Sequence, residues 1–202
     1  NTTGASNVAI GREALHANTT ASSNTAVGKH ALRANTTADN NTAVGKDALS
    51  ANTTGAQNTS IGMNTLFDNT TGADNTALGV SALANNTTAD NNTAIGRAAL
   101  ELNTTGHSNV AVGALALDAN TTGVANTAMG YGALSTNTTS SNNTAVGYNS
   151  MTDTTGAHNT AIGQSAAKET TSGTNNTAVG SQALLKNTTG YDNVAVGRNS
   201  LD

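Results

Sequence analysis

The stretch Asn24-Thr25-Ala26-Val27-Gly28 recurs along the whole chain, and this recurrence decides the fold. Its glycine returns every 17 residues, with one interval of 16 residues between Gly147 and Gly163. A strict period of this kind is typical of solenoids and repeat arrays, in which each repeat packs only on its neighbours. The sequence therefore predicts a single repeat array over residues 1–202. Because the chain begins and ends nearly in phase with the repeat, we expect it to be an excerpt of a longer repeat protein.

Residues Asn18 to Ala34, NTTASSNTAVGKHALRA, serve as the type unit, and its positions are numbered 1 to 17. Position 9 is Ala except at Ser60, position 10 is always aliphatic or Met, and position 15 is Leu in ten of twelve units. Position 7 is Asn and position 11 is Gly in every unit. The Asn column consists of Asn7, Asn24, Asn41, Asn58, Asn75, Asn92, Asn109, Asn126, Asn143, Asn159, Asn176 and Asn193. The Gly column consists of Gly11, Gly28, Gly45, Gly62, Gly79, Gly96, Gly113, Gly130, Gly147, Gly163, Gly180 and Gly197.

The segment Asn-Thr-Ala-Val alternates with a period of two and carries β-branched residues, which predicts a strand. Thr25 and Val27 would share one face of this strand, and Ala26 the other. An invariant Gly at position 11 indicates a corner where φ is positive or another backbone approaches closely. Ala31-Leu32 predicts a second short strand. The fold class is therefore an all-β parallel β-solenoid, or β-roll, of about twelve 17-residue coils.

Stacking identical coils about 4.8 Å apart places each position in a ladder along the rod. The invariant Asn at position 7 suits an inward amide ladder, in which each side chain hydrogen-bonds to its copies above and below. We expect this ladder, the corner glycines, and the Val/Ile and Leu stripes to stabilise the rod. The variable positions 12, 13, 16 and 17 should face water.

Each coil offers few bulky apolar side chains, so an isolated rod would be only marginally stable and lateral association of copies is expected. Two columns of small residues are the predicted flat contact surfaces for this association. They include Ala9, Ala26 and Ala43 at position 9, and Ala14, Ala31 and Ala48 at position 14.

Composition excludes several classes of partner. The net charge is −4 and no run of like charge occurs, whereas a nucleic-acid or anionic-membrane surface needs a dense basic footprint. No apolar run approaches the roughly 20 residues of a membrane span, so none is expected in this segment. The chain has no Cys, which excludes disulfides and thiolate metal sites.

The units resemble a known pattern. Asn7-Val8-Ala9-Ile10-Gly11 and Asn109-Val110-Ala111-Val112-Gly113 are similar to the head repeats of trimeric autotransporter adhesins of the YadA-like kind. In that family a shorter Asn-Ser-Val-Ala-Ile-Gly unit builds a left-handed parallel β-roll, and three chains associate laterally. Similar longer units resemble those of large bacterial surface proteins and phage-type fibres. The resemblance implies a left-handed roll, an extracellular setting and self-association, and it rests on about five residues of each unit.

Asn-Thr-Thr matches the N-glycosylation pattern at Asn1 and at nine further sites. One interpretation is a sugar-coated fibre; the other is a turn in which Asn caps backbone groups. Crowding at the coil spacing favours the turn, as does the persistence of both Thr residues where Asp153 and Glu169 replace Asn in units of irregular length. The nine further candidate sites are Asn18, Asn35, Asn52, Asn69, Asn86, Asn103, Asn120, Asn137 and Asn187.

Threonine columns suggest ice binding as another hypothesis, since flat Thr ladders on a β-solenoid can order water. Asn18 and Thr20 would share one face in this hypothesis. That face pairs Asn with Thr rather than Thr with Thr, which weakens the case.

The remaining polar residues predict neither a metal site nor catalysis. His16, His30, His107 and His158 occupy different repeat positions, so they form no column. No nucleophile, base and orienting acid recur at one level of the stack, as an active site would require. We therefore predict a non-enzymatic protein without a cofactor.

The sequence favours a structural repeat segment of an extracellular bacterial-type fibre or filament at the cell surface. Its partners would be copies of itself, in a lateral trimer or an end-to-end filament, with a surface ligand or glycan as a further possibility. The alternatives are the head of a trimeric adhesin, which binds host or surface ligands, and an ice-binding β-solenoid.

Overall fold

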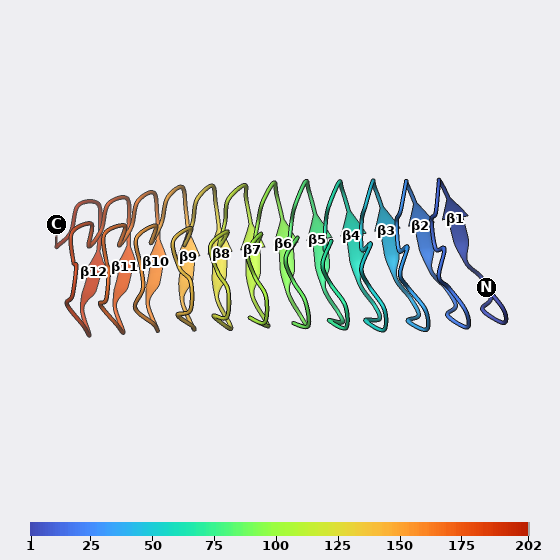
Figure 1. Ribbon diagram of the computed structural model, residues 1–202. Helices are drawn as coiled ribbons and strands as arrows, with labels where there is room; N and C mark the ends of the chain where they lie inside the picture. Colours follow the sequence, from blue (N-terminus) through green and yellow to red (C-terminus); the bar gives the residue numbers. More distant parts are fainter. Residues whose placement is uncertain (202) are drawn as a thin grey trace.

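The computed structural model describes residues 1–201 and is built from turns and twelve three-residue strands that form one parallel sheet (Figure 1). The chain advances by one coil per repeat, so the two termini lie at opposite ends of an elongated rod. The fold is a parallel β-solenoid, as the period predicts. The strands are β1 (Val8–Ile10), β2 (Thr25–Val27), β3 (Thr42–Val44), β4 (Thr59–Ile61), β5 (Thr76–Leu78), β6 (Thr93–Ile95), β7 (Val110–Val112), β8 (Thr127–Met129), β9 (Thr144–Val146), β10 (Thr160–Ile162), β11 (Thr177–Val179) and β12 (Val194–Val196).

Each strand pairs with the next at identical repeat positions. Between β2 and β3, for example, Ala26 lies opposite Ala43 and Val27 opposite Val44. The sheet order β1 to β12 follows the chain without a crossover. Every residue type of the repeat therefore forms a straight column along the rod.

The core of each coil is small. Ala26, Ala31 and Leu32, at positions 9, 14 and 15, are fully buried, and their equivalents form one continuous cluster. The prediction that the Ala columns are lateral contact surfaces is therefore wrong. It fails because the interior between the strand and the returning chain admits only small side chains at positions 9 and 14. The Val/Ile column at position 10 points outward instead, and only the Leu column of the two expected stripes is buried.

The predicted second strand at Ala31-Leu32 is replaced by turns. His30 and Leu32 have φ values of 61° and 51°, in the left-handed region that extended strands do not use. The turns still hydrogen-bond between coils, because His30 N donates to Arg12 O at 2.9 Å and Leu32 N donates to Ala48 O at 3.0 Å. The back of each coil is thus irregular in conformation but bonded to both neighbours.

Gly at position 11 serves both purposes that the sequence suggested. The twelve glycines of this column have φ between 118° and 139°. A Cβ atom built on Gly62 would also lie 2.7 Å from the carbonyl oxygen of Gly79 in the next coil. Neither the backbone conformation nor the stacking distance accepts a side chain at this corner.

The irregular spacing near the C-terminus reduces to the loss of one residue. Thr154 and Thr170, and not Asp153 and Glu169, occupy position 1, since both are buried there. Thr170 N donates to Ala167 O, just as Asn137 N donates to Leu134 O. Only position 3 is missing, between Thr155 and Gly156. The loss lies beside the exposed Thr155, outside the strand, where it leaves the pairing of β9 with β10 intact.

Candidate interaction surface

The predicted Asn ladder at position 7 is present and buried. Asn58 N donates to Asn41 Oδ1 at 2.9 Å, and Asn58 Nδ2 donates to Gly72 O at 2.9 Å. Asn58 Oδ1 in turn accepts from Asn75 N at 3.0 Å. Each Asn side chain therefore bonds to the coils on both sides. Most of these bonds are to backbone groups, and fewer are to the neighbouring Asn side chains.

A second Asn ladder runs along position 1, which the sequence presented as glycosylation sites. Asn69 Nδ2 donates to Asn52 Oδ1 at 2.9 Å and to Gly72 O at 2.9 Å. A glycan would bond to this same nitrogen, so attachment requires the side chain to leave the folded stack. Eight of the candidate Asn residues are at most 2% exposed, and Asn187 is half-buried. The eight are Asn18, Asn35, Asn52, Asn69, Asn86, Asn103, Asn120 and Asn137.

The second ladder is interrupted where Thr154 and Thr170 take position 1. Asn137 Oδ1, Thr154 Oγ1 and Thr170 Oγ1 are buried without a hydrogen-bond partner in the described chain. The shorter Thr side chain carries no amide to donate to the Asn oxygen one coil back. Three of the five buried side-chain oxygens without a partner in the described chain lie in this segment.

Threonine hydroxyls differ by position. At position 2 they bond to the next coil, as Thr53 Oγ1 does to Thr70 O at 2.9 Å. At position 8, the hydroxyl of Thr76 has no partner within residues 1–201 and that residue is exposed. The expected shared face of Asn18 and Thr20 is not formed, because this segment is a bend that buries Asn18 and exposes Thr20.

The outer face of the sheet carries an uncharged strip along the whole rod, here called the outer strip. It consists of positions 8 and 10 of every strand, and these hold only Thr, Val, Ile, Leu and Met. Leu78 is 44% exposed and Ile162 is 43% exposed, values typical of side chains that face solvent. Position 8 contributes Val8, Thr25, Thr42, Thr59, Thr76, Thr93, Val110, Thr127, Thr144, Thr160, Thr177 and Val194. Position 10 contributes Ile10, Val27, Val44, Ile61, Leu78, Ile95, Val112, Met129, Val146, Ile162, Val179 and Val196.

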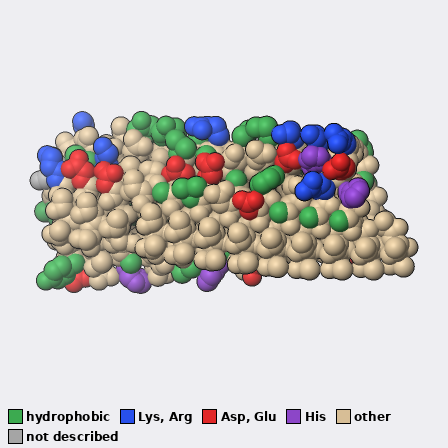
Figure 2. Space-filling model, viewed as in Figure 1, with side chains coloured by type: hydrophobic (Ala, Val, Ile, Leu, Met, Phe, Trp, Pro, Cys, Tyr) green, Lys and Arg blue, Asp and Glu red, His purple; other side chains and the backbone are tan. Residues whose placement is uncertain are grey.

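Two rims of opposite charge border the outer strip. The end rim is position 12, directly after the corner glycine; it has cations but no carboxylate. The start rim is positions 5 and 6, before the strand; it has carboxylates but no Lys or Arg. Figure 2 shows Lys and Arg along one long edge of the rod, with Asp and Glu side chains close beside them, and no Lys or Arg on the opposite edge. The end-rim cations are Arg12, Lys29, Lys46, Arg97 and Arg198, and the start-rim carboxylates are Asp39, Asp74, Asp90 and Asp192.

A charged cluster lies beside the end rim in the first three coils, at position 13. His30 Nδ1 lies 2.8 Å from Asp47 Oδ1, and His30 Nε2 lies 3.3 Å from Glu13 Oε2. Burial raises the pKa of the Asp47 carboxyl, but hydrogen bonds and charges from Lys46 and His30 outweigh it, so the net pKa is lowered. The carboxylates of this cluster also pair with two end-rim cations of the same chain, because Lys46 Nζ lies 3.0 Å from Asp47 Oδ2 and Arg12 Nη2 lies 3.5 Å from Glu13 Oε1.

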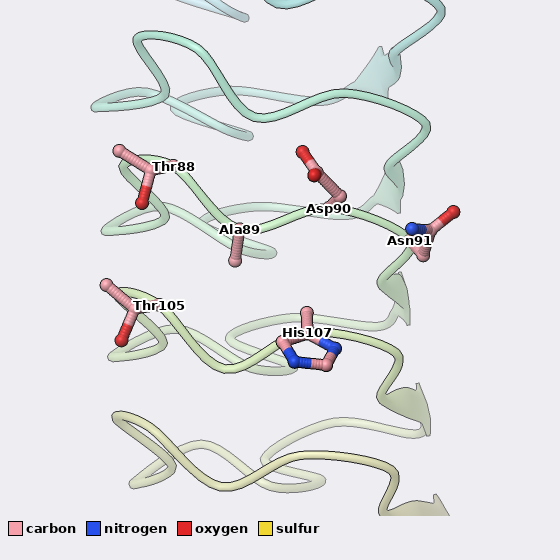
Figure 3. Close-up of a pocket in the computed structure, with 6 residues that line it drawn as sticks. All are labelled: Thr88, Ala89, Asp90, Asn91, Thr105 and His107. Atoms are coloured by element: carbon pink, nitrogen blue, oxygen red, sulfur yellow. The ribbon is translucent and has the colours of Figure 1, made fainter.

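A carboxylate and an imidazole line one hollow of the described chain. Asp90 Oδ1 accepts a hydrogen bond from Ala73 N at 2.7 Å, and His107 Nδ1 lies 3.2 Å from Ser108 Oγ. These two side chains face a shallow depression of about 300 Å³, but each bonds to its own surroundings rather than to the other (Figure 3). The depression is lined by Thr88, Ala89, Asp90, Asn91, Thr105 and His107.

Metal-binding and membrane-spanning features are likewise lacking from the described chain. Residues 1–201 contain no group of three His, Cys, Asp or Glu side chains placed to hold a metal ion. They also contain no helix long and apolar enough to cross a membrane.

Comparison with protein-family models, with curated proteins and with solved structures found no match to this chain. The similarity to adhesin head repeats therefore remains one of short motifs. The outer strip and its rims are the most distinctive surface of the described chain, and sequence reasoning missed them. The sequence could have indicated this surface, because positions 8 and 10 carry no charged residue in any repeat.

Proposed function

We propose that this chain is a structural rod segment of an extracellular, bacterial-type fibre at the cell surface. One observation carries the proposal: every coil is bonded to the next by the strand ladder, the back turns and the Asn ladder at position 7, and most coils also by the Asn ladder at position 1. Such a molecule offers length and stiffness.

Stiffness follows from the direction of these bonds. The strand pairing of β3 with β4, the bond from Asn58 N to Asn41 Oδ1 and the bond from Asn52 Nδ2 to Asn35 Oδ1 all run along the rod axis. Bending must lengthen several of them at once, at about 1 kcal/mol for each bond broken. A rod of this construction supports mechanical extension better than it supports induced fit around a ligand.

Electron microscopy of the native material, imaged without purification, tests this function. We expect long, uniform filaments with an axial repeat of about 4.8 Å. Short rods of fixed length grouped in threes on stalks would contradict a filament. They would favour the alternative that the adhesin resemblance implies, a trimeric head that binds host or surface ligands.

Ice binding is a second candidate, and one observation favours it. The unpaired Thr hydroxyls of position 8 form a straight column beside the methyl-rich column of position 10, on a sheet whose strands are in register. The surface therefore differs from the Asn-and-Thr face expected from the sequence. Thermal hysteresis of the purified chain tests this candidate, and its absence at millimolar concentration would eliminate it.

A further inference from the structure

We infer that the outer strip is the surface on which a second copy of this chain docks, with the two rods parallel and in register. The inference deepens the proposed fibre by naming the partner and the contact surface. It has its own test, because lateral pairing can fail in a chain that still forms filaments end to end.

The strip has the chemistry and size of an interface. Twelve strands spaced about 4.8 Å apart give a strip about 53 Å long, and side chains two residues apart on a strand span about 7 Å. With side-chain width included, the strip covers roughly 500 Å² per copy, or about 1,000 Å² for a pair, which reaches the usual threshold for a specific interface. The strip is uncharged and half apolar, because position 8 is Thr in nine of the twelve coils, and its size matches the largest surface patches of monomers, which are often functional. A flat, uncharged face also permits close packing at the usual separation of stacked sheets.

The charged rims select the orientation. When a two-fold axis parallel to the rods relates the two copies, the rods are parallel and the strands of the two facing sheets run in opposite directions. The cationic end rim of one copy then meets the acidic start rim of the other. Antiparallel rods, related by an axis along the strands, would place cation against cation and carboxylate against carboxylate. Like charges opposed across an interface disfavour that arrangement.

The rims also select the register. Asp39 and Lys46 belong to one coil, Asp90 and Arg97 to another, and Asp192 and Arg198 to a third. In-register parallel packing brings each of these carboxylates toward the cation of the same coil in the other copy. A shift by one coil separates all three pairs. Asp74, Arg12 and Lys29 have no counterpart of opposite charge in the rims of their own coils.

Several of these groups are free to make such contacts. Within residues 1–201, neither Arg97 nor Arg198 forms an ion pair, and both are exposed. The Asp192 side chain has no hydrogen-bond partner in the described chain. Asp39 binds Ser22 N through Oδ1, so its other oxygen is available.

Zero-length carbodiimide cross-linking of a mixture of isotopically light and heavy chains tests the arrangement. Asp39 and Lys46 of one chain lie before and after β3, with corners at Asn40 and Gly45, and the isotope label distinguishes an amide between two chains from one within a chain. We expect a Lys46–Asp39 amide that joins a light to a heavy chain. Lys46→Arg keeps the charge but removes the reactive amine, and should abolish this product alone. Absence of the product in the wild-type chain would overturn the parallel, in-register arrangement.

Sedimentation of strip variants tests the surface. Val112→Lys places a charge in the middle of the outer strip without entering the core, and we expect at least a 100-fold weaker association. Thr122→Lys, at an exposed position 3 outside the strip, is the matched control and should associate like the wild type. Circular dichroism establishes that both variants are folded. A wild-type chain that is monomeric at tens of micromolar, or unchanged association of the Val112→Lys variant, would overturn the inference.

Discussion

Asn75 illustrates how single polar side chains stabilise this rod. Its Oδ1 accepts from Asn92 N at 2.9 Å, while its Nδ2 donates to Ala89 O at 2.8 Å and to Asn58 Oδ1 at 3.2 Å. The residue is fully buried, and a buried polar group without a partner costs about 1–3 kcal/mol. The ladder is therefore a structural requirement of the narrow core.

Replacing this side chain should be costly. We expect Asn75→Ala to lower the free energy of unfolding by about 1–3 kcal/mol, because the buried Asn92 N loses its acceptor while Ala89 O and Asn58 Oδ1 each lose one of two donors. Urea denaturation followed by circular dichroism measures the change. Thr71→Ala, at an exposed position 3, is the control and should change the midpoint little. An unaltered midpoint for Asn75→Ala would show that the ladder contributes no stability.

Asp118 is a residue that works against stability at neutral pH. Burial raises its pKa, and the charge of Glu101 adds to the rise, while hydrogen bonds from the Asp118 and Ala119 backbones oppose it. A raised native pKa means that the protonated form is favoured in the folded state. The stabilisation by the protonated carboxyl is complete below the ordinary Asp pKa of 3.8 and is lost as the pH rises through the native pKa.

The neutral isostere should therefore stabilise the rod. We expect Asp118→Asn to raise the free energy of unfolding at pH 7 by less than about 0.5 kcal/mol, because solvent screens a half-exposed carboxyl, and the gain to disappear near pH 3. Thermal unfolding at several pH values measures both effects. Asp68→Asn, an exposed carboxylate for comparison, should show no such gain. Equal gains at pH 3 and pH 7 would contradict an origin in ionisation.

At the scale of the coil, a regular strand is followed by turns at positions 12 to 17, and the backbone conformation of these turns is one that L-residues disfavour. Leu at position 15 has a positive φ in unit after unit, for example 52° at Leu83 and Leu100. A bulky L-residue in this region costs of order 1 kcal/mol or more. Burial of the Leu side chain and the hydrogen bonds to both adjacent coils offset this strain, and they impose it on every copy.

The interrupted Asn ladder is the weak element of the described stack. We expect the double change Thr154→Asn and Thr170→Asn to raise the free energy of unfolding by about 1–2 kcal/mol, because Asn137 Oδ1 then gains an amide donor. Urea denaturation measures the gain. Thr139→Asn, at exposed position 3, should leave stability unchanged. A loss of stability in the double variant would show that the missing residue narrows the site so that it no longer accepts Asn.

At the scale of the whole molecule, the rod is a stack of nearly equivalent coils. Its stability therefore depends on equivalent repeat positions staying aligned from coil to coil, and less on any single coil. Columns remain continuous only when insertions and deletions keep the strand and its corners aligned. The natural loss of one residue before Gly156 respects this condition, because it falls beside the exposed Thr155, outside the strand.

Deletion of a complete repeat should therefore be tolerated. Removing residues 76–92 joins Asn75 to Thr93 and restores every column, so we expect a folded rod shorter by about 4.8 Å. Removing residues 76–91 instead places an extra Asn at the start of a strand and turns its outward residues inward. We expect that variant to have a clearly lower melting temperature, measured by circular dichroism. Equal melting temperatures would show that the coils do not require this phase.

The sequence by itself determined the parallel solenoid, the strand at positions 8 to 10, the corner glycines and the Asn ladder at position 7. It could do so because identical units at a fixed spacing must stack like upon like. The period does not specify which side chains of a coil face its interior or which conformation the turns adopt. Ala26 rather than Val27 faces the core, Asn18 is a buried ladder residue, and Leu32 adopts a left-handed turn.

Those features were decided only by the tertiary structure. The returning chain closes over one face of the strand, and the room left inside admits Ala, Asn and one Leu but not the β-branched column. The hydrogen bonds from coil to coil then hold Leu32 and His30 in conformations that their local sequence disfavours. Positions 8 and 10 face outward for the same reason. Because side chains alternate along each strand, these two uncharged positions together form the outer strip.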